Sequence, residues 1–141
     1  MILVDANILL YAVADESPRH DAARDWLDER LSGTTRVGLP WPSILAFLRL
    51  ISNPRVYRRP LPLADAWQRA TSWLEQPVAW VPLPTPRHTE VLGELLGRES
   101  ASRLVPDMHI AALAIEHGLR VCTTDGDFAR FAGVSWENPL A

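Results

Sequence analysis

The sequence predicts an α/β fold in which helices cover a parallel sheet. Short apolar runs alternate with longer segments of helical periodicity along the whole chain, which is the element order of parallel α/β proteins. The 141 residues are enough for one hydrophobic core, and no repeat, low-complexity tract or linker divides them. We therefore expect one domain over residues 1–141.

The first half of the chain is predicted to hold two strands and four helices. Residues 1–4 form a continuous apolar run, which is typical of a strand buried on both faces. The third helix opens at Pro42 and ends before Asn53 and Pro54, because proline is accepted in a first helical turn but disfavours helix before it. We expect helices at 6–14, 19–31, 42–51 and 63–74, and the second strand at 36–39.

The second half continues the alternation. A largely apolar helix is predicted at 105–117, and Gly118 stands where a left-handed helix cap is expected. A strand at 120–123 follows, and a short helical turn then leads to the last strand. The remaining elements are expected at 78–83 (strand), about 89–96 (helix) and 134–136 (strand).

Composition excludes several classes of protein. The net charge of −3 does not fit a generally basic nucleic-acid coat protein. All 14 basic residues are arginine, which suits either bidentate phosphate contacts or the codon bias of a GC-rich genome. A single cysteine rules out a disulfide framework and a cysteine-based zinc site. No apolar run has the length of a membrane helix, and the first residues lack a signal-peptide pattern, so we expect a cytoplasmic protein without membrane contact.

Aspartates occupy the positions where a ligand site of such a fold would lie. Asp5 directly follows the first strand, and Asp125 follows the strand at 120–123, with Asp127 two residues further on. The carboxyl ends of parallel strands open on one edge, so Asp5 and Asp125 converge if these two strands are neighbours. Asp107 stands in the first turn of the helix at 105–117, where the helix dipole favours a carboxylate.

Carboxylates that converge repel one another, so such a cluster is costly without a cation. Oxygen ligands without nearby cysteine or histidine favour Mg²⁺ or Mn²⁺, and these ions can assist hydrolysis of a phosphodiester. Each aspartate taken alone is more typical of a turn residue or a helix cap than of a metal ligand. The joint placement favours the metal site.

Four blocks of the chain are similar to one known family. They are Val4-Asp5-Ala6-Asn7, the block from Trp41-Pro42 to Pro54-Arg55, Pro106-Asp107-Met108-His109-Ile110-Ala111-Ala112-Leu113-Ala114, and Thr123-Thr124-Asp125-Gly126-Asp127-Phe128. Together they resemble the PIN domain, and most closely the VapC toxins of bacterial toxin–antitoxin pairs. The resemblance implies a three-layer α/β/α sandwich with a central parallel sheet in which strands one and four are adjacent. It also implies an Mg²⁺- or Mn²⁺-dependent endoribonuclease that a cognate, VapB-like antitoxin inhibits.

The same resemblance assigns roles to individual residues. Asp5 and Asp107 would be the principal metal ligands, and Asp125 would complete the catalytic site. Asp127 would support that site, and Asn7 would hydrogen-bond near the first carboxylate.

One position departs from the family pattern. Family members usually carry a glutamate three residues before an arginine in the helix after the second strand, and here Ala46 precedes Arg49. The missing carboxylate weakens the case for a second metal ion. It also motivates an alternative, a catalytically weak or inactive PIN protein that binds RNA or titrates antitoxin. A phosphotransferase with an aspartyl nucleophile is disfavoured, because no second acid follows Asp5 by two residues and the chain has no lysine to clamp a phosphoryl group.

Arginines and tryptophans suggest contact surfaces. Arg49 shares a helical face with Ala46 and is expected to point toward the acidic edge, where it would contact RNA phosphate or the antitoxin, or form only an ordinary salt bridge. A basic loop is predicted to contact the RNA backbone and consists of Arg55, Arg58 and Arg59. Trp67, Trp73 and Trp26 are expected mainly in the core, with a homodimer face or an antitoxin groove as the alternative.

Overall fold

The computed structural model describes residues 1–141, and a five-stranded parallel sheet forms its centre. The strand order is β3-β2-β1-β4-β5, and every neighbouring pair is parallel. β1 pairs with β4 through Leu3 opposite Val121, which confirms that strands one and four are adjacent. The strands are β1 (Ile2–Val4), β2 (Val37–Gly38), β3 (Ala79–Trp80), β4 (Arg120–Cys122) and β5 (Ser135–Glu137).

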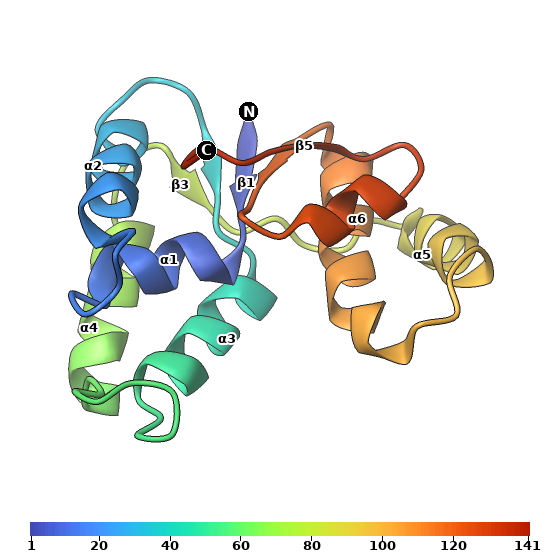
Figure 1. Cartoon of the computed structure of the whole chain (residues 1–141). Helices are drawn as coiled ribbons and strands as arrows, with labels where there is room; N and C mark the ends of the chain where they lie inside the picture. The colour runs from blue at the N-terminus through green and yellow to red at the C-terminus, as the bar shows by residue number, and fades with distance from the viewer.

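Helices lie on both sides of this sheet, as Figure 1 shows. One side carries α1 (Ala6–Val13), α2 (His20–Leu31), α3 (Trp41–Ile51) and α4 (Leu63–Leu74). The other side carries α5 (His88–Gly97) and α6 (Val105–His117), together with the 3₁₀ helices η1 (Ser102–Leu104) and η2 (Gly126–Arg130). The predicted three-layer α/β/α sandwich is therefore confirmed.

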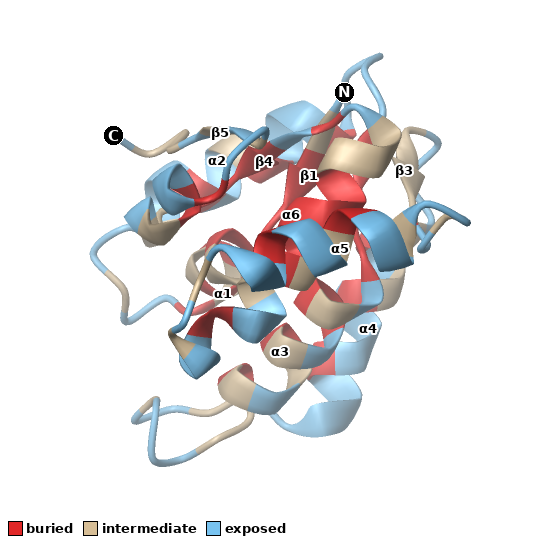
Figure 2. Cartoon of the chain, turned by 90° about the vertical axis from the view of Figure 1, so that its right-hand side faces the viewer, coloured by how far each residue is buried: buried red, intermediate tan, exposed pale blue.

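The alternation of side chains along β1 supplies both hydrophobic layers. Val4 belongs to the cluster under α1–α4, whereas Leu3 belongs to the cluster under α5 and α6, and both are fully buried. Successive residues of a strand point to opposite faces, so a strand buried on both sides must be apolar throughout. Figure 2 shows the buried residues along the strands and on α6, while the outer side of α5 is exposed.

Local sequence signals place the starts of three helices at the same edge of the sheet. Asp5 caps α1, and its carboxylate accepts the N–H of Ala6. Pro42 and Pro106 stand in the first turns of α3 and α6, where a missing N–H costs no helical hydrogen bond. Gly118 ends α6 with a φ of 67°, a left-handed conformation that favours glycine.

Two predicted strands are shorter than expected. The segments 36–39 and 78–83 contribute only the two-residue strands β2 and β3. Leu39 still donates its N–H to the carbonyl of Trp80, but Pro82 has no N–H with which to continue the ladder. Pro82 also packs so closely that a Cβ on Gly38 would lie 2.8 Å from its Cγ.

The tryptophans divide between the core and the surface. Trp73 is buried and packs against Phe47 in the core, as expected. The core expectation is wrong for Trp67, which is 46% exposed and stacks on the exposed Trp41, with ring centroids 6.4 Å apart. No helix is both long and apolar enough to cross a membrane.

Candidate functional site

Asp5 lies where β1 ends, at the carboxyl edge of the sheet. Its side chain is almost completely buried, and both carboxylate oxygens accept hydrogen bonds. Oδ1 accepts the N–H of Ala6 at 2.8 Å. Oδ2 accepts the hydroxyl of Thr123 at 2.9 Å and the side-chain amide of Asn7 at 3.2 Å. These bonds fix the orientation of the carboxylate before any ligand binds.

Thr123 connects the ends of β1 and β4. Its fully buried hydroxyl accepts the side-chain amide of Asn7 and the backbone N–H of Asp125, each at 3.0 Å. The side-chain carbonyl of Asn7 in turn accepts the N–H of Thr124 at 3.1 Å. Asn7 thus lies beside the first carboxylate as predicted, and it also anchors the loop that carries Asp125.

Asp125 and Asp127 have different environments although they share one loop. Asp125 accepts the backbone N–H of Asp127 at 2.9 Å and so caps η2. The carboxylate of Asp127 accepts a hydrogen bond from Nη1 of Arg103 at 2.9 Å, and Nη1 of Arg130 lies 3.8 Å from its other oxygen. The hydrogen bond from Arg103 holds the pKa of Asp127 below its usual range.

Asp5, Asp107 and Asp125 line one cavity of about 240 Å³. Its walls come from α1, α3 and α6, and Ala46 and Ser43 contribute to the wall from α3. Neither Asp127 nor Arg49 lines it, and Arg49 is exposed. A larger hollow of about 450 Å³ lies at the opposite edge of the sheet, but no carboxylate lines it.

Burial and mutual repulsion raise the pKa values of two of these acids. Burial raises the pKa of Asp5, and the charge of Asp125 adds to this, whereas the hydrogen bonds from Thr123 and Ala6 oppose it. Asp107 is half-buried, and burial together with the charges of Asp5, Asp125 and Asp127 raises its pKa to about 6. A cavity of this kind favours a bound cation, because a cation relieves the repulsion.

The donor set fits a hard divalent cation that keeps part of its hydration shell. No three His, Cys, Asp or Glu side chains lie close enough together to hold an ion directly. Mg²⁺ usually retains several waters and takes only one or two direct carboxylate bonds. The Ser43 hydroxyl on the cavity wall is buried without a hydrogen-bond partner, so a water of such an ion would satisfy it.

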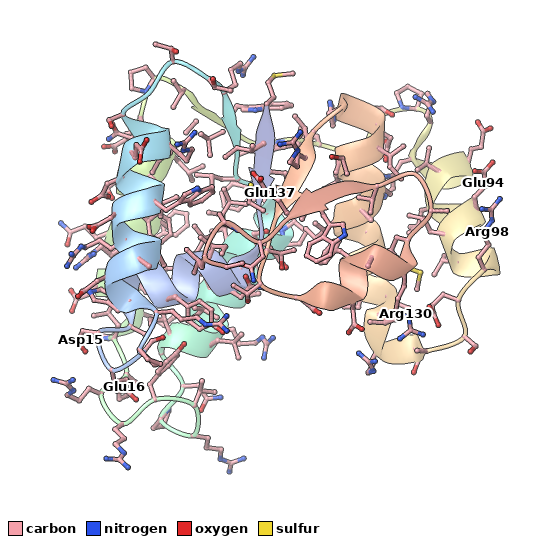
Figure 3. The ribbon with its side chains drawn as sticks, turned by 45° about the horizontal axis from the view of Figure 1, so that its top comes forward. Asp15, Glu16, Glu94, Arg98, Arg130 and Glu137 are labelled. Atoms are coloured by element: carbon pink, nitrogen blue, oxygen red, sulfur yellow. The ribbon has the colours of Figure 1, made fainter.

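The predicted basic loop lies elsewhere. The carboxylate of Glu16 accepts the backbone N–H groups of Arg58 and Arg59 at 2.9 and 3.1 Å. Arg59 also pairs with Asp15 at 3.0 Å, and Arg55 donates its N–H to Asn53. Figure 3 labels Asp15 and Glu16, which adjoin the loop. They follow the last turn of α1, so the eight residues of that helix, about 12 Å, separate them from Asp5.

Three residues of the site were not predicted from the sequence. Thr123, Ser43 and Arg103 are common polar residue types without a diagnostic spacing. For Thr123, its position between an apolar strand and Asp125 was a usable signal, because a hydroxyl there can reach the neighbouring strand end. Ser43 and Arg103 carry no such signal.

The fold and the cavity define an α/β protein with an acidic site at the carboxyl edge of its sheet. The PIN domain family matches residues 2–134. Ribonuclease VapC37 of Mycobacterium tuberculosis is 44% identical over 142 aligned residues, which cover 100% of this chain and 99% of that protein. Ribonuclease VapC33 of the same organism is 41% identical, with 99% of each chain covered. The chain belongs to the PIN domain family and, within it, to the VapC ribonucleases.

Solved structures share the fold. The VapBC2 structure from Rickettsia felis, bound to a promoter DNA fragment, contains a chain that matches with a TM-score of 0.68 and 18% identity over 98% of both chains. VapC20 from Mycobacterium tuberculosis, described as a toxin that cleaves the sarcin–ricin loop, matches with a TM-score of 0.67 and 21% identity, covering 96% of this chain and 99% of that one.

Proposed function

We propose that this protein is the toxin of a toxin–antitoxin pair and an Mg²⁺- or Mn²⁺-dependent endoribonuclease. One observation carries the proposal: Asp5, Asp107 and Asp125, from three distant parts of the chain, line the same cavity. The full-length similarity to VapC ribonucleases supports RNA as the substrate.

Each part of the site has a role in this proposal. Asp5 and Asp107 hold the ion and Asp125 completes its surroundings, while Thr123 and Asn7 keep the carboxylate of Asp5 in place. When bound, the cation polarises the phosphodiester and lowers the pKa of an attacking water. The negative charges of these residues repel RNA phosphate, and a bound cation would reduce that repulsion, so the metal should strengthen RNA binding.

The proposed partners are an antitoxin, a second copy of the chain and RNA. A VapB-like antitoxin is the proposed inhibitor, because the VapBC2 structure contains a chain with the same fold as this one. The exposed Trp41 and Trp67 offer an apolar surface for a homodimer or for the antitoxin. The arginines at 55, 58 and 59 remain a proposed contact for the RNA backbone, and the cytoplasm, where RNA targets are found, is the proposed location.

Cleavage of RNA by purified protein tests the proposal. We expect cleavage with Mg²⁺ or Mn²⁺, none with a chelator, and a loss of at least about 100-fold in Asp5→Asn and Asp107→Asn, because metal-bound charge and an activated water supply most of the acceleration. Asp21→Asn on the exposed side of α2 removes the same charge away from the cavity and is the matched control. Cleavage that persists in a chelator, or in both cavity variants, would contradict the proposal.

A non-catalytic PIN protein is the second candidate, and Ala46 favours it. Ala46 lines the cavity where the family pattern has a glutamate, so that wall offers no fourth carboxylate. RNA binding without any metal-dependent cleavage would establish this alternative.

A further inference from the structure

Arg103 brings a positive charge to the rim of the acidic cavity. It lies in η1, directly before the first turn of α6 that carries Asp107. Its Nη1 donates to Asp127, which stands two residues after Asp125. The position of Arg103 is thus set by η1, which leads into α6, and by the loop that carries Asp125 and Asp127. Its charge acts on the site, since it lowers the pKa of Asp107 against the larger upward effect of burial.

The guanidinium of Arg103 has hydrogen-bond donors that the chain does not use. Its side chain is 65% exposed, and within the chain it makes one hydrogen bond, from Nη1 to Asp127. Nε and Nη2 make no hydrogen bond within the chain, so their N–H groups are available to a ligand. A guanidinium presents a planar fork that matches two oxygens of a phosphate, so Arg103 can bind a phosphate without releasing Asp127.

Arg130, the other arginine near Asp127, is already paired with carboxylates of the chain. Its Nη2 donates to Glu99 at 2.9 Å, and its Nη1 faces Asp127 at 3.8 Å. Figure 3 labels it on the segment between β4 and β5. Both ends of this guanidinium face a carboxylate, so Arg130 has fewer donors available for RNA than Arg103 has.

RNA needs a cation at this rim. The phosphates on either side of the scissile bond approach a cavity lined by three carboxylates, and one divalent ion offsets only part of that charge. We propose that Arg103 binds a backbone phosphate of the RNA next to the scissile bond, and that Asp127 holds the Arg103 guanidinium in place for it. This inference rests on the proposed function, and it identifies the supporting role of Asp127 as that of a positioning residue.

RNA binding without cleavage tests the inference. The probe is a fluorescent single-stranded RNA oligonucleotide, bound to protein that carries Asp107→Asn. The Asp107 side chain makes no hydrogen bond within the chain, and its replacement removes one of the repelling charges of the cavity, so this background keeps its fold. Affinity is measured by anisotropy over a series of salt concentrations for Arg103→Gln, Arg103→Lys and the control Arg120→Gln.

Arg120 is a matched control. It is 56% exposed and pairs with Glu137, but it begins β4 and so lies at the opposite end of that strand from Asp125. We expect Arg103→Gln to weaken binding about tenfold at low salt, since a charge-assisted phosphate contact is lost. The slope of log K against log salt should fall by about 0.7, the value for one phosphate of a single strand. Arg103→Lys should restore the slope but only part of the affinity.

Equal affinity and equal slope in Arg103→Gln and Arg120→Gln would overturn the inference. A thermal melt checks that Arg103→Gln is folded, which we expect because an exposed ion pair contributes little to stability. Failure of the proposed function gives a different result, namely no RNA cleavage by the unmodified protein with Mg²⁺ or Mn²⁺, whatever the salt slopes show.

Discussion

Thr123 donates its hydroxyl hydrogen to Oδ2 of Asp5 across 2.9 Å, although the two residues are 118 positions apart in the chain. The bond lies at the edge where β1 and β4 end, and it is fully buried. Because the same hydroxyl accepts hydrogen bonds from Asn7 and from the N–H of Asp125, one side chain sets the positions of two carboxylates of the cavity.

Thr123→Val should therefore destabilise the protein. Valine has nearly the same shape but leaves the donors of Asn7 and Asp125 unpaired, so we expect a loss of about 1–3 kcal/mol in the free energy of unfolding. Denaturant unfolding measures the loss. Thr124→Val is the control, since the Thr124 side chain makes no hydrogen bond within the chain. Equal stability of the two variants would show that the Thr123 bonds contribute little.

Asp107→Asn should stabilise the metal-free protein at high pH. The pKa of Asp107 is about 6 in the folded chain and 3.8 as its ordinary value, so the folded state holds this proton more tightly than the unfolded state. Stability from this group is greatest below about pH 4 and falls as the pH rises through 4 to 6. Asp107→Asn cannot ionise at this position, so it does not lose stability in this pH range. In melts from pH 4 to 8, the Tm of the variant minus that of the unmodified protein should increase with pH. A difference that does not change with pH would contradict the raised pKa of Asp107.

Mn²⁺ should raise the melting temperature of the unmodified protein. An ion that binds only the native cavity stabilises it by about 2.7 kcal/mol at a concentration 100 times its Kd. The shift should shrink at pH 5, because Asp107 then takes up a proton that competes with the metal. Melts of Asp5→Asn should show no shift, whereas the exposed Asp21→Asn should behave as the unmodified protein. A shift retained in Asp5→Asn would place the ion elsewhere.

Ala46→Glu should lower the stability of the metal-free protein and raise its affinity for metal. The new carboxylate would enter the cavity wall beside the existing ones, so repulsion lowers the Tm without metal while Mn²⁺ binds more tightly. Ala46→Gln has nearly the same size without the charge and isolates the electrostatic effect. Calorimetric titration with Mn²⁺ measures the change, and equal affinities for the two variants would argue that residue 46 does not face the ion.

The sequence was informative wherever a residue type had few structural options. The apolar run before Asp5, the prolines at 42 and 106 and the glycine at 118 each allow few conformations, and the elements they delimit are the predicted ones. Strand length at 36–39 and 78–83 was predicted less well. It depends on how closely Pro82 packs on Gly38, which is a tertiary contact.

The candidate site was predictable in its carboxylates but not in what orients them. The sequence alone predicts that Asp5 and Asp125 follow strands and that Asp107 begins a helix, and these positions lie at one edge of the sheet. The partners of the acidic residues come from the fold, because the bonds of Thr123 to Asp5 and of Arg103 to Asp127 join residues distant in sequence. Arg49 shows the limit of helical spacing, since it lies one turn from Ala46 and yet does not line the cavity.

A crystal structure of the protein grown with Mn²⁺ tests the central claim most directly. Anomalous scattering identifies the ion without reference to activity. We expect one strong peak inside the cavity, within about 2.0–2.4 Å of carboxylate oxygens of Asp5 and Asp107 and with waters completing its shell. An empty cavity at millimolar Mn²⁺, or a peak bound only by other residues, would contradict the account.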